Sequence, residues 1–380
     1  MKNYPYSKIE RKLNKKRLFV FALFILWLTF MTPFVNESDW FLRITAQMIP
    51  ILTYEKQYGN PNINYAADYQ VPEWFYEDEN EEPAGEDSAA VEMRMEEQTT
   101  EEKSVTTLAD GTNGTAYTRQ QLKDPDFLKS KIFVIDSNTS MTKEELDIKN
   151  LLDTDLSIDG LKDKPENEKE KEYKILIYHT HGSESFKDSR EGKKEDTIIG
   201  VGSYLAKLLE EEYGISVYHD ETAYDMIDGV LDRSKAYENA YENVTKILKE
   251  NPSIQVVIDL HRDGVDEETH LVTEVNGKKT AKIMFLNGVS RSNTNGDIAY
   301  LNNPNKLTNL AFSFQMYLTG KEYYGDYVRK IYVRSYRYNL HLLPRTTLIE
   351  AGAQNNTLEE EKNAMEPLAA ILDKVLSKEE

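Results

Sequence analysis

Residues 175–181 read ILIYHTH, a short apolar run that ends on two histidines. Residues 254–261 (IQVVIDLH) and 347–350 (TLIE) repeat this arrangement, because each apolar run leads into a side chain able to bind a metal or transfer a proton. Buried parallel strands have this β-branched, apolar character. Open α/β sheets place their chemistry just beyond the carboxyl ends of such strands. The three runs therefore predict one cleft in which distant parts of the chain meet.

Helical patterns separate these runs. Residues 198–213 carry an apolar stripe at helical spacing, and residues 233–250 carry another. Alternating strands and helices predict an α/β domain over residues 126–380, with a mostly parallel or mixed central sheet and helices on both faces. Further strands are expected at 131–135, 215–218, 282–287 and 330–334, and further helices at 142–152, 305–318 and 357–376. Thr357 and Glu360 form a capping box for the last helix.

The N-terminus predicts a membrane anchor. Residues 18–35 (LFVFALFILWLTFMTPFV) carry no charge and approach the ~20 residues needed to cross a bilayer. Residues 1–17 hold seven Lys or Arg against one Glu, so the positive-inside rule keeps this tail in the cytoplasm and exports the rest. A cleaved signal peptide is the alternative, although Met31–Val35 is a poor cleavage site.

Two segments connect the anchor to the domain. Residues 36–56 are amphipathic, and lie on the outer membrane surface, against a partner, or in an ordinary short helix. Residues 57–125 lose apolar periodicity, and residues 77–103 hold twelve acidic against two basic residues. Such a composition predicts a disordered acidic linker that self-repulsion keeps extended.

Composition also excludes several functions. The net charge of −20 argues against a nucleic-acid partner, which requires a basic face. The chain has no cysteine, which excludes disulfides, a thiol nucleophile and Cys-ligated zinc. Any metal must therefore use histidine and carboxylate ligands.

His181 and His261 are the candidate ligands of a catalytic zinc. Such an ion keeps three protein ligands and one open position for water, and the third ligand is often a carboxylate. Glu184 follows His181 closely, and Glu195 precedes the helix expected from residue 198, so both remain candidates. Glu350, at the end of the third run, is the candidate general base that takes a proton from the attacking water and passes it to the leaving nitrogen.

Other polar residues support this centre. His179 lies two residues before His181, so a regular strand would point both to the same side. Asp259 and Asp263 flank His261 and could accept its imidazole N–H. Three arginines are candidates for holding a substrate carboxylate: Arg262, Arg291 and Arg345.

The motifs resemble those of a known family. Residues 179–186 (HTHGSESF), 259–264 (DLHRDG) and 348–360 (LIEAGAQNNTLEE) look like stage II sporulation protein P, a family of membrane-anchored cell-wall hydrolases of endospore-forming bacteria. The resemblance covers roughly residues 130–376 plus the anchor. The family's catalytic domain is itself similar to zinc-dependent N-acetylmuramoyl-L-alanine amidases, which implies an amidase-like fold.

This resemblance assigns roles. It implies that His181 and His261 hold zinc and that Glu350 is catalytic, whereas amidase-like spacing points to Glu195 and the His-Thr-His-x-x-Glu signature to Glu184. It also implies a second activity on peptide cross-links of peptidoglycan. Partnership with sporulation proteins D and M during engulfment follows as well, with the catalytic domain in the space between the septal membranes.

Two other functions remain open on the sequence. One is a zinc peptidase that acts only on stem peptides. The other is a wall-binding scaffold that keeps the fold and lacks the metal.

Overall fold

The computed structural model describes residues 114, 116–162 and 172–377. The predicted cytoplasmic tail, anchor and amphipathic segment, and the linker up to residue 113, lie outside the described residues. No helix in this described part combines the length and apolarity that a membrane span requires.

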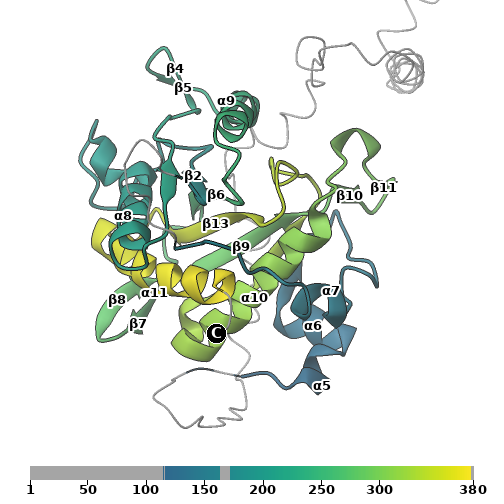
Figure 1. Cartoon of the computed structure of the whole chain (residues 1–380). Coiled ribbons are helices and arrows are strands. Elements are labelled where there is room, and N and C mark those ends of the chain that lie inside the picture. The colour runs from purple at the N-terminus through teal and green to yellow at the C-terminus, as the bar shows by residue number, and fades with distance from the viewer. Residues whose placement is uncertain (1–113, 115, 163–171, 378–380) are drawn as a thin grey trace, which may run out of the picture. The chain divides into compact units, whose positions relative to one another are not determined.

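A seven-stranded sheet forms the centre of the domain (Figure 1), in the order β1-β12-β9-β13-β6-β2-β3. All neighbouring pairs are parallel except β9 and β13, which are antiparallel. The predicted mixed α/β sheet is therefore confirmed. The strands are β1 (Phe133–Ile135), β2 (Ile175–Tyr178), β3 (Val217–His219), β6 (Val256–Asp263), β9 (Ile283–Gly288), β12 (Ile331–Arg334) and β13 (Thr346–Ala353).

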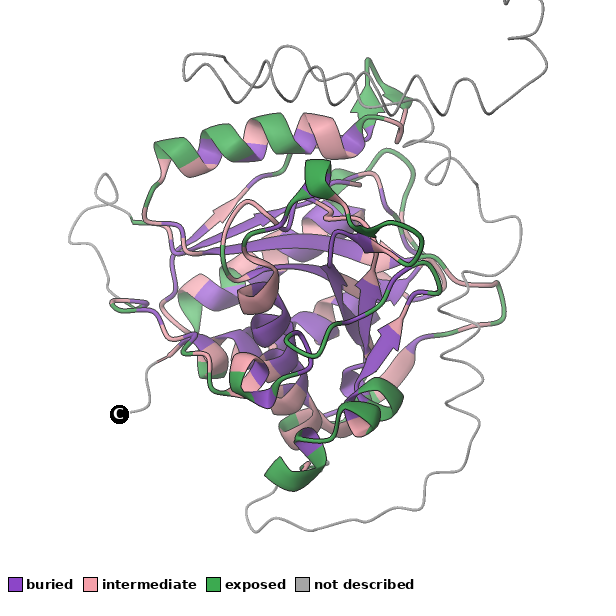
Figure 2. Cartoon of the chain, turned by 90° about the vertical axis from the view of Figure 1, so that its right-hand side faces the viewer, coloured by how far each residue is buried: buried purple, intermediate pink, exposed green. Residues whose placement is uncertain are grey.

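Helices cover both faces of this sheet. The apolar side chains of α8 (Ile198–Glu211), α10 (Lys306–Tyr324) and α11 (Leu358–Leu376) join one large core cluster. Those of α9 (Ala236–Glu250) pack on the opposite face, where Figure 2 shows a helix with an exposed outer side above the buried sheet. Alternate residues of a strand face opposite sides, so β2 sends Ile177 to the first cluster and Leu176 to the second.

The remaining elements are short. Three hairpins project from the sheet: β4 (Met226–Ile227) with β5 (Val230–Leu231), β7 (Val272–Val275) with β8 (Lys278–Ala281), and β10 (Arg291–Ser292) with β11 (Gly296–Asp297). Helices α5 (Arg119–Leu122), α6 (Pro125–Lys131) and α7 (Ile148–Leu152) and the 3-10 turns η2 (Lys194–Asp196), η3 (Ala299–Leu301) and η4 (Gly325–Tyr327) complete the domain. The predicted capping box of α11 is confirmed, with Thr357 and Glu360 bonding each other's backbone N–H.

Two predicted boundaries are wrong. The folded part begins before residue 126, because Thr118 and Gln121 form a capping box that starts α5, and Leu122 is buried in the core. Only the second half of the helix expected at 142–152 exists, as α7. Residues 142–146 form a single turn, closed by the Leu146 N–H on the Thr142 carbonyl. Asp147 then adopts an extended backbone and caps a new helix by accepting the Lys149 backbone N–H, so α7 starts only at Ile148.

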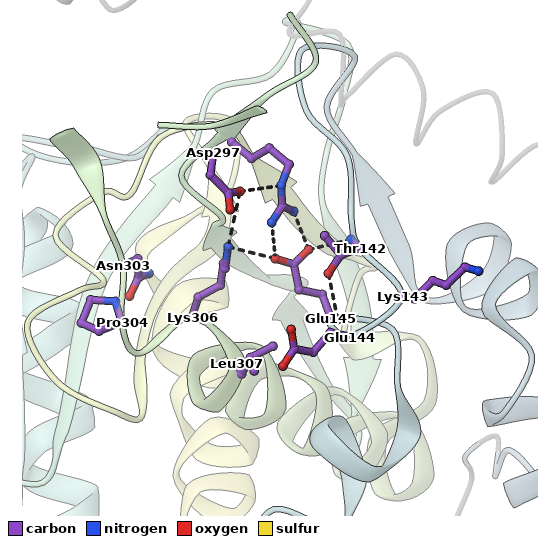
Figure 3. Close-up of a pocket in the computed structure, with 10 residues that line it drawn as sticks. Thr142, Lys143, Glu144, Glu145, Asp297, Asn303, Pro304, Lys306 and Leu307 are labelled. Atoms are coloured by element: carbon purple, nitrogen blue, oxygen red, sulfur yellow. Dashed lines mark hydrogen bonds and ion pairs between the residues drawn. The ribbon is translucent and has the colours of Figure 1, made fainter. Parts of the chain in front are cut away.

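Glu145 lies at the centre of an ion-pair network beside a cavity of about 420 Å3 (Figure 3). Both nitrogens at the end of Arg291 donate to its carboxylate, at 2.6 and 2.9 Å, and Lys306 Nζ lies 3.0 Å away. Asp297 closes the outer side of the same two cations. The network therefore ties residues 142–145 to the sheet end that carries β10.

Glu145→Gln should lower the free energy of unfolding by about 1–3 kcal/mol at pH 7, because it removes charge-assisted hydrogen bonds from a buried site. Burial acts to raise the pKa of Glu145, but bonds from Arg291, the Thr142 backbone and Lys306 outweigh it and lower the pKa below its ordinary 4.5. A carboxyl whose pKa is lower in the folded than in the unfolded chain stabilises the fold at pH values above its ordinary pKa. This stabilisation is lost as the pH falls through the folded-state pKa. Urea unfolding should therefore show a gap between the two proteins that narrows below pH 4.5.

Glu144→Gln is the matched control, because Glu144 is exposed beside Glu145. Its stability should follow wild type at every pH. An equal loss in both variants would contradict the role of the network.

Candidate active site

Adjacent strands bring the predicted residues together. In the pairing of β13 with β6, Glu350 stands opposite His261, and in the pairing of β6 with β2, Asp259 stands opposite Tyr178. The sequence predicts that each apolar strand ends just before its functional residues, and this is correct only for β2. Strands β6 and β13 continue to Asp263 and Ala353, so His261 and Glu350 project from within the sheet.

His181 and His261 face each other. Their ring centres lie 5.2 Å apart at an interplanar angle of 85°. Within the described residues, His181 Nδ1 and His261 Nε2 are both buried without a hydrogen-bond partner. Asp259 Oδ1 does lie 2.8 Å from His261 Nε2, in an ionic contact that lacks hydrogen-bond alignment. Two imidazoles, each with a buried nitrogen that lacks a hydrogen-bond partner in the described part of the chain, thus lie side by side.

Glu184 is the carboxylate that the structure places beside this pair. Its Oε2 lies 3.6 Å from His261 Nδ1 and accepts the backbone N–H of Arg262 at 3.0 Å. Glu195, the other candidate for third ligand, lies in η2, with a 61% exposed side chain 3.6 Å from Arg190. The geometry therefore favours Glu184 as a ligand.

The buried charges of the site affect one another. Burial lowers the pKa of His181 to about 4, and the charge of His261 adds to this effect. Burial also disfavours the charged forms of His261 and Glu184, but nearby opposite charges outweigh it. The carboxylates of Asp259 and Glu184 raise the pKa of His261 well above its ordinary value. His261 in turn lowers the pKa of Glu184 to about 2. His261 between two carboxylates marks a place that favours positive charge.

Glu350 completes the site. Its Oε2 is buried and makes no hydrogen bond with any described residue, although the side chain as a whole keeps some exposure. Burial raises the pKa of this carboxyl to about 8, and the nearby Asp263 and Glu184 carboxylates add to the rise, against the opposing charge of His261. A carboxyl with a pKa near neutral can both accept and donate a proton at physiological pH.

The residues present fit a zinc ion in their chemistry. Two imidazoles and a carboxylate form a common catalytic zinc set. A tetrahedral ion at 2.0–2.1 Å from one nitrogen of each ring sets two ring centres about 5 Å apart, close to the observed 5.2 Å. Among the described residues, however, no three His, Asp or Glu side chains already converge on one point as a metal site. The pair of rings has the required spacing, while the carboxylate would have to move toward them.

His179 does not share the side of His181, contrary to the expectation from a regular strand. Strand β2 ends at Tyr178, and the following turn sends the two histidines in different directions. His179 Nδ1 lies 2.7 Å from the carbonyl oxygen of Leu260, and its Nε2 lies 2.9 Å from His219 Nε2. A carbonyl only accepts, so Nδ1 of His179 carries the proton and Nε2 accepts from His219.

The predicted supporting residues are distributed differently. Asp259 accepts two hydrogen bonds from Thr180 in addition to its contact with His261. Asp263 pairs with Arg329 at 2.7 Å in a buried ion pair instead of contacting the His261 ring. The three candidate arginines donate to groups of the chain itself. Arg262 donates to the carbonyls of Ser185 and Asp263, and Arg345 donates to the carbonyls of Leu156 and Ser157. Arg291 donates to the carboxylates of Glu145 and Asp297.

Sequence reasoning missed three residues at the site. Strand β3 ends on His219, so the rule that selected the other histidines could have found it. Tyr237 of α9 packs its ring edge-on to His181, 5.7 Å between centres. Arg233 lies 3.9 Å from Glu184. The last two carry no local signal, because they reach the site from α9 and from the segment just before it, which pack on the sheet.

The His179–His219 pair depends on Gly202 of α8. A Cβ atom at Gly202 would lie 2.6 Å from His179 Nε2 and 2.8 Å from His219 Nε2. We expect Gly202→Ala to lower the free energy of unfolding by about 1–3 kcal/mol, because the fully buried His179 ring has no room to yield. Thermal unfolding measures this. Gly264→Ala, where a Cβ meets nothing within 4 Å, should leave the melting temperature near wild type, and equal losses would contradict the close packing.

Comparisons with known proteins give the chain its family. The curated stage II sporulation protein P of Bacillus subtilis (strain 168) is 24% identical over 213 residues, 53% of this chain and 50% of that protein, so the chain spans about half the length of this relative. Solved structures of N-acetylmuramoyl-L-alanine amidases are similar as well. They include Ami1 of Mycobacterium abscessus (14% identity, TM-score 0.34, 54% of this chain, 99% of that chain) and an amidase of Clostridium difficile 630 (17% identity, TM-score 0.32, 53% of this chain, 94% of that chain). These scores are too low to carry an argument. The model of the family described as Stage II sporulation protein P (SpoIIP) matches residues 45–373, and since this is well over half of the chain, the chain belongs to that family.

Proposed function

We propose that the chain is a membrane-tethered zinc hydrolase that cleaves the N-acetylmuramoyl-L-alanine amide of peptidoglycan. One observation carries the proposal: Glu350 stands opposite His261 in adjacent strands, and His261 faces His181, with buried polar atoms on all three that lack a partner among the described residues. Unpaired buried polar groups are costly, and they persist where a ligand or reaction uses them. Membership of the family supports the same assignment.

The mechanism follows from the chain's own groups. His181, His261 and Glu184 would hold the ion. A zinc ion bound there acts as a Lewis acid on an amide carbonyl and makes a water nucleophilic near neutral pH. Glu350 takes the proton of the attacking water and then donates it to the leaving nitrogen, a double role suited to a carboxyl with a pKa of about 8.

Supporting groups keep the ligands in place. Asp259 holds the Thr180 backbone and hydroxyl, which fixes the turn that carries His181. The Arg262 backbone N–H fixes one oxygen of Glu184. Outer partners of this kind orient metal ligands.

Localisation and partners are part of the proposal. We propose that residues 18–35 anchor the chain with its N-terminus in the cytoplasm, that the catalytic domain acts between the septal membranes, and that sporulation proteins D and M are its partners. The acidic linker would let a membrane-fixed enzyme reach the wall.

Digestion of purified peptidoglycan by the zinc-loaded full chain tests the function. Mass spectrometry should detect glycan strands free of peptide and stem peptides with a new L-alanine N-terminus. Products cut only within peptide cross-links would indicate the zinc peptidase instead. Binding to the wall without any product would indicate the scaffold.

A further inference from the structure

The site is acidic, whereas a peptidoglycan stem peptide carries carboxylates. Five carboxyl groups lie in or beside the site, and one of them, Asp263, is paired with Arg329. The five are Glu184, Asp225, Asp259, Asp263 and Glu350. A metal held by the site would offset much of this charge at its ligands. A cation at the rim, outside the ligand set, then decides whether the site attracts a substrate carboxylate, since charges at close range in a poorly solvated site interact strongly. The position of nearby cations therefore bears on which substrate the site accepts.

Arg262 is not suited to this task. Its Nε donates to the carbonyl of Ser185 and its Nη1 to the carbonyl of Asp263, both at 3.0 Å. These bonds hold two backbone segments together. A substrate carboxylate would have to break them to use the same guanidinium.

Arg233, unlike Arg262, has a guanidinium that is not engaged in hydrogen bonds to the backbone of the described residues. It lies at the rim of the site, just before α9, with a side chain that is 39% exposed. Its Nε is buried and has no hydrogen-bond partner in the part of the chain that the structure describes. Its nearest carboxylate oxygen, Glu184 Oε1, is 3.9 Å away, at the outer limit of an ion pair. The guanidinium thus retains donors for a further anion.

The segment that carries Arg233 is fixed to the loop that follows His181. Asp225 accepts the backbone N–H of Ser183 at 3.2 Å and its hydroxyl at 2.5 Å. The Asp225 carbonyl in turn accepts the Asp232 backbone N–H at 2.8 Å, next to Arg233. The charge of Arg233 also acts on both His181 and Asp225. These bonds fix the backbone next to Arg233 relative to the loop that carries His181, so the chain itself needs little ordering when a ligand binds.

We propose that Arg233 binds a carboxylate of the substrate's stem peptide and makes the site selective for peptides whose D-glutamyl residue keeps a free carboxylate. The planar guanidinium pairs with a carboxylate through two parallel N–H···O bonds, which an ammonium group cannot reproduce. The proposal rests on the peptidoglycan hydrolase function and adds which peptides it accepts. Arg233 touches the substrate away from the bond that breaks, so it acts on binding and specificity.

The test compares two synthetic fragments. One is N-acetylmuramoyl-L-alanyl-D-glutamate whose γ-carboxyl is capped as a methylamide and whose α-carboxylate is free. The other is the same capped fragment with the α-carboxyl converted to an amide. Binding to the zinc-loaded full chain is measured by calorimetry in a Glu350→Gln background, which prevents turnover. Charge-assisted hydrogen bonds predict that the acid binds about 10- to 100-fold more tightly than the amide, and that Arg233→Gln brings this ratio close to one.

Matched variants separate recognition from folding. Lys235→Gln removes the same charge from an exposed position two residues away and should preserve the ratio, while Arg233→Lys should keep part of it. In the active chain, Arg233→Gln should raise KM for the acid with little change in kcat. An unchanged ratio in Arg233→Gln, or an equal loss for acid and amide, overturns the proposal. If the wild-type chain cleaves neither fragment, the hydrolase function fails, but the binding ratio still decides the role of Arg233.

Discussion

Glu350→Gln should reduce the rate of peptidoglycan cleavage by about 100- to 10,000-fold, the range expected when a general acid–base group is removed. The amide has the size of the carboxylic acid but cannot accept and return a proton. Oε2 of Glu350 is buried and the pKa of this carboxyl is raised to about 8, so the neutral amide resembles a protonation state that the site already accommodates. The variant should therefore fold, and elemental analysis should find as much zinc as in wild type.

Glu361→Gln is a demanding control for this experiment. Glu361 is fully buried, neither of its oxygens has a hydrogen-bond partner in the described part of the chain, and burial raises its pKa well above the ordinary value. It lies beside Gly352, within the bulge that follows Glu350. Its variant should cleave at nearly the wild-type rate. A Glu350→Gln chain that retained most of its activity would remove Glu350 from the mechanism.

The convergence of the site could be predicted because strand pattern and chemistry coincide. The apolar runs that lead to His179, Asp259 and Glu350 are neighbours in the sheet, so collecting strand-end residues placed the right groups together. The end of β6 could not be predicted, because a strand covered on both faces continues through polar residues once these find partners. Asp259, for example, is paired with Thr180 inside the sheet. Strand β13 continues past Glu350 through residues 351–353, which have no polar side chain.

Other features depend on tertiary packing that has no local signal. Strand β9 runs antiparallel to β13, yet side chains alternate in the same way in either direction, so periodicity cannot reveal it. As a result, β9 and β12 turn their carboxyl ends to the opposite edge, and Arg291 lies with Glu145 instead of at the site. Arg233 reaches Glu184 only because its segment packs over the sheet.

Replacing either candidate histidine ligand by alanine should remove the zinc and the activity together. Elemental analysis should fall from about one zinc per chain, the stoichiometry of a single catalytic site, to near none for both His181→Ala and His261→Ala. Zinc at 100 times its dissociation constant should raise the unfolding free energy of wild type by about 2.7 kcal/mol. It should leave that of both variants unchanged. His270→Ala is the control, since this 43% exposed histidine bonds Glu360 outside the site.

The two variants should differ once the metal is removed with a chelator. His261 separates the carboxylates of Asp259 and Glu184, at 2.8 and 3.6 Å, so His261→Ala leaves two buried negative charges without the group between them. A broken buried pair costs about 3–5 kcal/mol of unfolding free energy. His181 is held neutral by burial, with its pKa lowered to about 4, so its loss should cost less. Equal destabilisation in chelator, or full zinc content in either variant, would contradict the arrangement of charges from which the metal site is inferred.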